Sequence, residues 1–227
     1  MPRLRVLAYN IWQGGRGDRL AEAVRSAQPD VVLVNESPKT PLIWRWRCRR
    51  LASSWGLRYV AGGRDAGSNM VAVGDGVQVR STHTSLVEQP LFRPRRGVVS
   101  AQLRVRGRLV GVVACHLSLD PEKRPMEVDR VIEAANRLRG PVLVAGDLNE
   151  EPDGPSWRRL RAAGYVDHGG EDWPTFPADE PTTRIDALLV RGAVRMLHHG
   201  DSGVPEELQR VASNHRAVLG VVELDAF

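Results

Sequence analysis

Short apolar runs separated by polar or glycine-containing segments recur along the whole chain. Residues 4–9, 31–34 and 142–145 are nearly continuous apolar runs, which is typical of strands covered on both faces. Between residues 57 and 113 the segments are β-branched or alternate between apolar and polar, and glycines separate them, so this part predicts several strands. Arg106-Gly107 predicts a hairpin turn within it. The other predicted strands include 70–73, 98–105, 109–113, 185–190 and 217–224.

Helical spacing occurs between particular strands. After Asp18, which can cap a helix, Leu20 and Val24 fall on one face. Residues 125–139 show the same spacing and end at Gly140-Pro141, and a short helix is predicted at 156–163. Strands dominate the middle of the chain and helices follow certain strands. We therefore expect an α/β fold of two packed sheets with outer helices, as one domain over residues 1–227.

Polar residues stand at the ends of the predicted apolar strands. At four strands they stand at the carboxyl end, and at the last two strands they stand at the amino end. If those last two strands run antiparallel to the first four, all of these residues meet on one rim. The residues are Asn10, Asn35, Glu36, His116, Asp147, Asn149, Asp186, Asn214 and His215.

The residue types on this rim suit chemistry on a phosphate. Asp147 and Asn149 are two positions apart and would face one ligand, the carboxylate to orient or deprotonate water and the amide to donate to an anionic oxygen. Glu36 supplies a hard oxygen for Mg²⁺ or Mn²⁺, and Asn10 can help to hold the ion. The pattern predicts metal-assisted phosphoester hydrolysis.

Two histidines extend the prediction. His215 with Asp186 makes an oriented imidazole, either a general base or a stabiliser of developing charge, and His116 can meet a phosphate oxygen. Taken singly, each rim residue also has an ordinary structural explanation, such as a strand end or an Asx-turn. All of them in this order are much harder to obtain by chance.

The overall composition sets limits on partners and setting. The chain has 227 residues, a net charge of +5 and a pI near 9.8, which favours anionic partners. Only two of the 32 basic residues are lysine, so codon composition also accounts for the arginine excess. No apolar run approaches the length of a membrane span, and the first residues predict a strand, not a signal peptide. Two cysteines favour a reducing cytoplasm, and a monomer is the default expectation.

The motifs that carry these residues resemble the endonuclease/exonuclease/phosphatase superfamily of Mg²⁺-dependent phosphoesterases, which includes pancreatic-type deoxyribonucleases and neutral sphingomyelinases. They cover nearly the whole chain in the family's order. As a set they are specific for the family and poorly specific for the substrate. The matching stretches are AYNIW, QPDVVLVNE, RRGVVSAQL, CHLS, GDLNEEP, TFPADEPTTRIDALLV and SNHRAV.

The resemblance implies a four-layer αββα sandwich of two mixed sheets, with its site on the predicted rim. It also implies roles: Glu36 and Asn10 bind the metal, Asp147 aligns or activates water, and Asn149 and His116 contact the scissile phosphate. Asp186 and His215 form the oriented pair, and Arg96 lies on the substrate side.

Two positions depart from the family's pattern. Asn35 stands where the family usually has glutamine, and Asn214 stands where SDH is usual. The second change removes a negative charge close to the metal, so we expect weaker metal binding or the loss of one metal position. We favour an active, specialised hydrolase, with a non-catalytic binding domain as the alternative.

Two arginine-rich segments are candidates for contact with substrate. In IWRWRCRRLASSW, residues 43–55, helical spacing places Trp44, Cys48, Leu51 and Trp55 in the core. Trp46, Arg47 and Arg50 remain on another face, which is either a solvated surface or a phosphate-gripping face with a stacking aromatic, and could equally meet an acidic membrane. The second cluster is Arg93, Arg95 and Arg96.

We therefore predict a divalent-metal-dependent phosphodiester hydrolase, most simply an endonuclease acting on DNA or another nucleic acid. Because no long insertion that would grip a duplex is evident, a small phosphorylated metabolite or a phospholipid headgroup is the alternative substrate. Trp173-Pro174 and an expected loop at residues 200–210 could shape a pocket.

Overall fold

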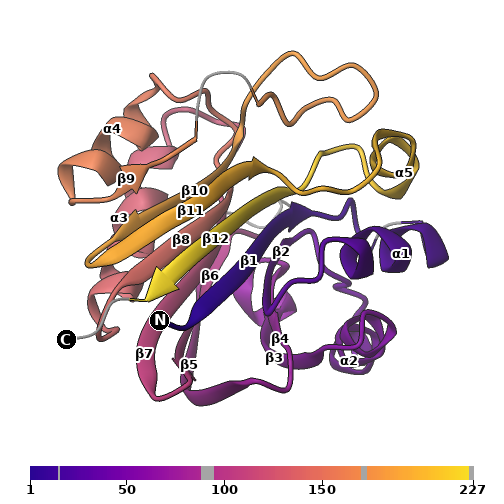
Figure 1. The fold of residues 1–227 in the computed structure, drawn as a ribbon. Helices are drawn as coiled ribbons and strands as arrows, with labels where there is room; N and C mark the ends of the chain where they lie inside the picture. Colours follow the sequence, from indigo (N-terminus) through magenta and orange to yellow (C-terminus); the bar gives the residue numbers. More distant parts are fainter. Residues whose placement is uncertain (15, 88–94, 170–172, 225–227) are drawn as a thin grey trace.

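Two six-stranded sheets pack face to face in the computed structural model, which describes residues 1–14, 16–87, 95–169 and 173–224 (Figure 1). In spatial order, the first sheet contains β11 (Val194–Asp201), β12 (Val218–Leu224), β1 (Arg3–Asn10), β2 (Val31–Asn35), β4 (Asn69–Val73) and β3 (Arg58–Gly63). The second contains β5 (Val77–Leu86), β6 (Gly97–Val105), β7 (Arg108–His116), β8 (Val142–Asp147), β10 (Asp186–Arg191) and β9 (Val166–Asp167).

Helices cover the outer face of each sheet, so the expected four-layer αββα sandwich is confirmed (Figure 1). The first sheet is covered by α1 (Asp18–Ser26), α2 (Trp44–Ser54) and α5 (Glu206–Ala212). The second is covered by α3 (Arg124–Asn136) and α4 (Pro155–Ala162). A short 3₁₀ turn, η1 (Arg64–Ala66), precedes β4.

Three apolar clusters hold the layers together. The central cluster lies between the sheets and contains inward-facing side chains of both, such as Leu33 and Leu143, which are fully buried. The other two clusters lie between each sheet and its helices. Of the four predicted core positions, Trp44, Cys48 and Trp55 are buried, and Leu51 is half-buried against the same cluster. Burial on both faces explains why the central strands are continuous apolar runs.

The direction of the strands creates the predicted rim. β1 pairs with β2 in parallel, and β7 pairs with β8 in parallel. β12 runs antiparallel to β1, and β10 runs antiparallel to β8. The carboxyl ends of the first four strands therefore meet the amino ends of β10 and β12, as the condition on the topology required.

Three elements differ from the sequence-based expectation or were not anticipated by it. Residues 200–210 are not simply a loop, because β11 extends to Asp201 and α5 begins at Glu206 and contacts α1. β11 and β5 are edge strands with many exposed polar residues, and such strands need no apolar run.

No helix in the described residues has the length and apolar character needed to cross a membrane.

Two tryptophans in helices should differ sharply in their effect on stability. Trp157 of α4 is fully buried and donates from Nε1 to the Glu150 carbonyl at 2.7 Å, whereas Trp46 of α2 is 57% exposed. Trp157→Ala should lower the free energy of unfolding by about 3–5 kcal/mol. Trp46→Ala should change it by less than about 0.5 kcal/mol. Denaturant unfolding measures both, and comparable losses would contradict the assigned packing.

Candidate active site

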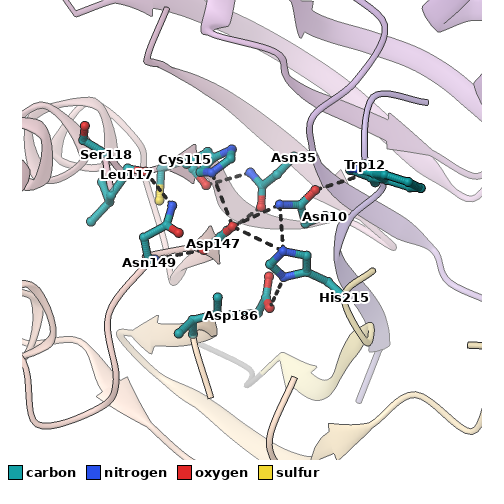
Figure 2. A network of polar contacts seen from close by, with 12 residues as sticks. Asn10, Trp12, Asn35, Cys115, Leu117, Ser118, Asp147, Asn149, Asp186 and His215 are labelled. Carbon is teal, nitrogen blue, oxygen red and sulfur yellow. Dashed lines mark hydrogen bonds and ion pairs between the residues drawn. The ribbon is translucent and has the colours of Figure 1, made fainter. Parts of the chain in front are cut away.

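Asp147 lies at the centre of the rim, flanked by a residue of each neighbouring strand. The register pairs it with His116 of β7 on one side and Asp186 of β10 on the other. Its Oδ2 atom lies 3.8 Å from His215 Nε2 (Figure 2) and 3.3 Å from His116 Nε2, and the side chains of Asp147, His116, Asp186 and His215 are all buried. The second sheet therefore presents Asp147 between His116 and Asp186, and the loop before β12 of the first sheet adds the second imidazole, that of His215.

His215 is held by a second carboxylate. Its Nδ1 atom lies 2.8 Å from Asp186 Oδ2, so its Nε2 atom is turned towards Asp147 (Figure 2). The ring of Phe176 packs against the imidazole, with 4.8 Å between the ring centroids. The predicted Asp186–His215 pair is thus formed, with the orientation of the imidazole fixed from two sides.

Thr175, which the sequence analysis missed, supports both halves of this pair. Its Oγ1 accepts from the backbone N–H groups of Ile185 and Asp186, each at 3.2 Å. Its carbonyl oxygen accepts from Arg216 N–H at 2.7 Å, next to His215. Only its place within TFPADEPTTRIDALLV hinted at a role, since a buried threonine carries no distinctive spacing.

The first sheet contributes two amides. Asn10 Nδ2 donates to Asp147 Oδ2 at 3.0 Å, while Asn10 Oδ1 accepts from Trp12 N–H at 3.1 Å (Figure 2). Asn35 Oδ1 accepts from the Asp147 N–H at 2.9 Å, and Asn35 Nδ2 donates to the Cys115 carbonyl and to Asn69 Oδ1, both at 2.7 Å. These contacts join the two sheets around Asp147.

Gly146 leaves the space that Asn35 occupies. A Cβ at this position would collide with the Cys115 carbonyl and lie 3.1 Å from Asn35 Nδ2, and the φ angle is +147°. Glu36 and Asn149, which follow two of the rim strands, have positive φ angles of 57° and 50°. Such conformations cost about 1–3 kcal/mol each in non-glycine residues and gather at functional sites.

The two imidazoles differ in charge. Burial lowers the pKa of His116 to about 4, against the opposing effect of Asp147, so this ring is neutral and its contact with Asp147 is not an ion pair. Burial alone would also lower the pKa of His215, but the carboxylates of Asp186, Asp147 and Glu36 together raise it to about 9. The centre therefore holds one neutral and one protonated ring near neutral pH.

Several side-chain oxygens are placed to bind a cation. Glu36 is half-buried, and its carboxylate makes no hydrogen bond or ion pair within the described part of the chain. Asn214 Oδ1 is buried without a hydrogen-bond partner among the described residues. Ligand atoms of Asp147, Asp186 and His215 also lie within 4.8 Å of one another, but the protonated His215 ring, held by Asp186, has no lone pair to offer a metal. Unpartnered hard oxygens beside buried carboxylates fit a divalent cation such as Mg²⁺.

The predicted substrate residues lie in three places. Asn149 donates from Nδ2 to the Leu117 carbonyl at 2.9 Å, beside Asp147. Arg96 is half-buried; burial lowers its pKa, and the negative charges of Glu127, Asp147 and Glu36 oppose this. Residues Trp46, Arg47 and Arg50 lie on α2, outside the network of Asp147. Arg95 is exposed, and Arg93 lies outside the described residues.

The sequence matches one family over most of its length. The model of the endonuclease/exonuclease/phosphatase family matches residues 7–215, which contain every rim residue from Asn10 to His215. The chain belongs to this family. Its members are phosphoesterases. Comparison with curated protein sequences gave no significant match.

Solved structures share the endonuclease/exonuclease/phosphatase fold at low identity. A family protein from Bacteroides vulgatus is 18% identical, with a TM-score of 0.79 over 99% of this chain and 100% of its own. A Bacteroides thetaiotaomicron mannosyl-6-phosphatase is also 18% identical, with a TM-score of 0.78 over 98% and 100%. ANGEL2, a 2′,3′-cyclic phosphatase solved with adenosine-2′,3′-vanadate, is 11% identical, with a TM-score of 0.76 over 99% and 96%.

Removal of the Asn35 amide should destabilise the protein. Asn35→Ala removes the side-chain partner of the Asp147 N–H, of the Cys115 carbonyl and of Asn69 Oδ1, and each buried group left unpaired costs about 1–3 kcal/mol. We expect a loss of about 3 kcal/mol or more in denaturant unfolding. Asn136→Ala, at the exposed end of α3, is the control and should cost less than about 0.5 kcal/mol. Equal losses would show that the amide bridge does not hold the sheets.

A divalent cation should raise the melting temperature. Saturation at about 100 times Kd stabilises a folded protein by about 2.7 kcal/mol, and Glu36→Ala should abolish the shift measured with Mg²⁺ or Mn²⁺. Asn214→Asp gives a negative charge to the side chain whose oxygen is unpaired, so it should tighten binding of the cation about ten-fold, as measured by titration calorimetry. Asp75→Ala removes an exposed carboxylate in the β4–β5 turn and should leave the shift unchanged. A full shift in Glu36→Ala would place the cation elsewhere.

Proposed function

We propose that this member of the family is a divalent-metal-dependent phosphodiester hydrolase that acts on nucleic acid, most simply as an endonuclease on DNA. One observation carries the proposal. A buried carboxylate, Asp147, stands between a neutral imidazole and one held by Asp186, with the free carboxylate of Glu36 on the same rim. These side chains offer groups suited to bind water, a phosphate and a cation.

We assign the water to Asp147. Its carboxylate is fixed by Asn10 and by the Asn149 N–H, which donates to Oδ1 at 2.9 Å, so it is held ready to orient water and to accept its proton. In the hydrolysis, the water oxygen forms a bond to phosphorus while the bond to the leaving oxygen breaks.

The remaining side chains would contact the phosphate. We assign Asn149 and His116 to its non-bridging oxygens, since an amide and a neutral ring can donate to them without adding charge. His215, with Nδ1 held by Asp186, would stabilise the charge that develops and return a proton to the leaving oxygen from Nε2. Arg96 supplies a positive charge on the same side.

Glu36 and Asn10 would hold the cation, Mg²⁺ or Mn²⁺, and Asn214 Oδ1 is a further ligand. Asn10 Oδ1 accepts one hydrogen bond from Trp12 and has a second lone pair. When bound, such an ion polarises the phosphate and lowers the pKa of water. Members of the endonuclease/exonuclease/phosphatase family generally depend on a divalent metal, which is consistent with this assignment.

A small phosphoester is the second candidate substrate. The mannosyl-6-phosphatase from Bacteroides thetaiotaomicron has the same fold as this chain, with a TM-score of 0.78, and its name describes a sugar phosphate. The adenosine-2′,3′-vanadate in ANGEL2 is a ribonucleotide analogue and is compatible with a nucleic-acid substrate, although it does not point to DNA. Two free, buried cysteines are compatible with the reducing cytoplasm that we propose as the setting.

Purified protein incubated with Mg²⁺ or Mn²⁺ should nick supercoiled plasmid or cleave single-stranded DNA or RNA. EDTA should stop the reaction, and Glu36→Ala or His215→Ala should lower the rate about 10²–10³-fold, because each removes a charge from the centre. Gel analysis of the products measures the rates, with Asp75→Ala as the control.

The substrate panel separates the candidates. Cleavage of a sugar phosphate but of no nucleic acid would replace the first candidate by the second. Unchanged rates in both variants would show that the rim is not the active site. Cation binding without hydrolysis of any substrate would support the non-catalytic alternative.

A further inference from the structure

A groove of about 450 Å³ runs between α1 and α2, outside the network of Asp147. Its α2 wall contains Trp46, Arg47 and Arg50, and its α1 wall includes Asp18 and Ala21. This volume falls within the range of sites that take a ligand the size of a nucleotide. The residues that the sequence singled out on α2 therefore line a concave surface and not merely a solvated helix face.

The groove begins where the cation-binding loops leave the rim. Gly14 lies in the loop after Asn10, and Pro38 lies two residues after Glu36, and both line the groove. Trp12 lies between Asn10 and Gly14 in the chain, and it is 45% exposed. Two loops that begin at rim residues therefore extend to the groove.

Two exposed tryptophans along this path each carry an arginine. Arg50 lies over the Trp46 ring, 5.4 Å from its centroid, and Arg16 lies over Trp12 at the same distance. Trp46 is 57% exposed, so much of its surface is open. Base–aromatic stacking tolerates any sequence, and arginine adds both a cation–π contact and a charge for phosphate.

The charge of the groove favours an anion. Asp18 is the sole acidic residue among its described lining residues, against Arg47 and Arg50. Arg47 donates to Thr40 Oγ1 at 2.7 Å and makes no ion pair within the described ranges, nor does Arg50. Arg45, on the same helix but outside the groove, is instead paired with Asp65 at 3.0 Å.

Concavity separates a strand from a membrane as the partner. Leu42 and Ile43 near the start of α2 are exposed, as a lipid-binding surface would require, but neither of them lines the groove. The arginines and Trp46 instead line a hollow. Paired bases stack on one another within a duplex, so the open face of Trp46 is accessible to an unpaired base.

We propose that the groove between α1 and α2 binds the flanking nucleotides of a single-stranded nucleic acid, with Trp46 stacking on a base and Arg47 and Arg50 contacting phosphates. The proposal rests on the proposed function for the identity of the substrate, and it specifies a single strand whose scissile phosphate lies at the rim. The groove itself takes no part in the bond cleavage.

Binding can be measured apart from hydrolysis. Fluorescence anisotropy of a labelled oligothymidylate in EDTA should report binding that weakens steeply with salt. Trp46→Ala should weaken it about ten-fold, and Arg50→Gln should reduce the slope of log affinity against log salt by about 0.7, the value of one phosphate contact on a single strand. Arg45→Gln removes the same charge from the same helix outside the groove and should change affinity by less than about two-fold.

Three results would overturn the proposal. Trp46→Ala could bind the strand as wild type does, or Arg45→Gln could lose as much affinity as Arg50→Gln. Alternatively, Trp46→Ala could reduce binding to phosphatidylserine vesicles while leaving oligothymidylate binding intact, which would identify a membrane surface. A duplex of matched length should bind more weakly than the single strand.

Turnover distinguishes failure of the groove from failure of the proposed function. On a long single strand, Trp46→Ala should raise KM without changing kcat, and on a small chromogenic phosphodiester it should change neither. If Trp46→Ala had the wild-type KM on the long strand, the proposed role of the groove would be contradicted, while the proposed endonuclease activity would stand. Strand binding that depends on Trp46, without hydrolysis of nucleic acid, would retain the groove and contradict the proposed endonuclease.

Discussion

The Asn35 side chain joins the two sheets at the point where the chemistry is assembled. From β2 it accepts a hydrogen bond from the backbone of Asp147 and donates one to the Cys115 carbonyl, both in the other sheet. Asn10 adds a hydrogen bond to Asp147, and Asn69 adds one to the Gly97 carbonyl, but the central cluster between the sheets is apolar, and apolar side chains attract one another without fixing a direction. The amide fixes direction and distance, so Asp147 is held relative to Asn10 and Glu36. Gly146, next to Asp147, has no side chain because a Cβ there would collide with the Cys115 carbonyl that Asn35 contacts.

This bridge also decides the electrical character of the centre. Because the sheets close around Asp147, His116 is buried and stays neutral, while His215 is kept protonated by the carboxylates around it. The same closure leaves Asn10 and Asp147 in direct contact. Two imidazoles of opposite charge state a few ångströms from one carboxylate can divide the work of holding a phosphate and protonating a leaving oxygen. The groove between α1 and α2, which we propose binds the flanking nucleotides, therefore takes no part in bond cleavage.

The rim could be predicted from the sequence because each polar residue interrupts an apolar run at a strand end. Continuous apolar strands that pair in parallel allow few arrangements of the two sheets. The order of the family's motifs along the chain favoured one of these arrangements. The edge strands β5 and β11 and the helix α5 left weaker signals, because half-exposed segments carry no continuous apolar pattern. Thr175 was missed for another reason: its role depends on backbone groups of Asp186 and Arg216, and these have no signature in the sequence.

The two departures from the family's pattern have different physical consequences. Asn35, though shorter than glutamine, uses both amide hydrogens and its oxygen in buried hydrogen bonds, so this exchange is absorbed by the fold. Asn214 Oδ1 is buried without a hydrogen-bond partner among the residues that the structure describes, so nothing there compensates for the lost charge. A buried acceptor left unpaired costs free energy unless a ligand satisfies it. Its effect therefore falls on whatever the centre binds, and affinity for a cation is where this chain should differ from relatives that carry aspartate there.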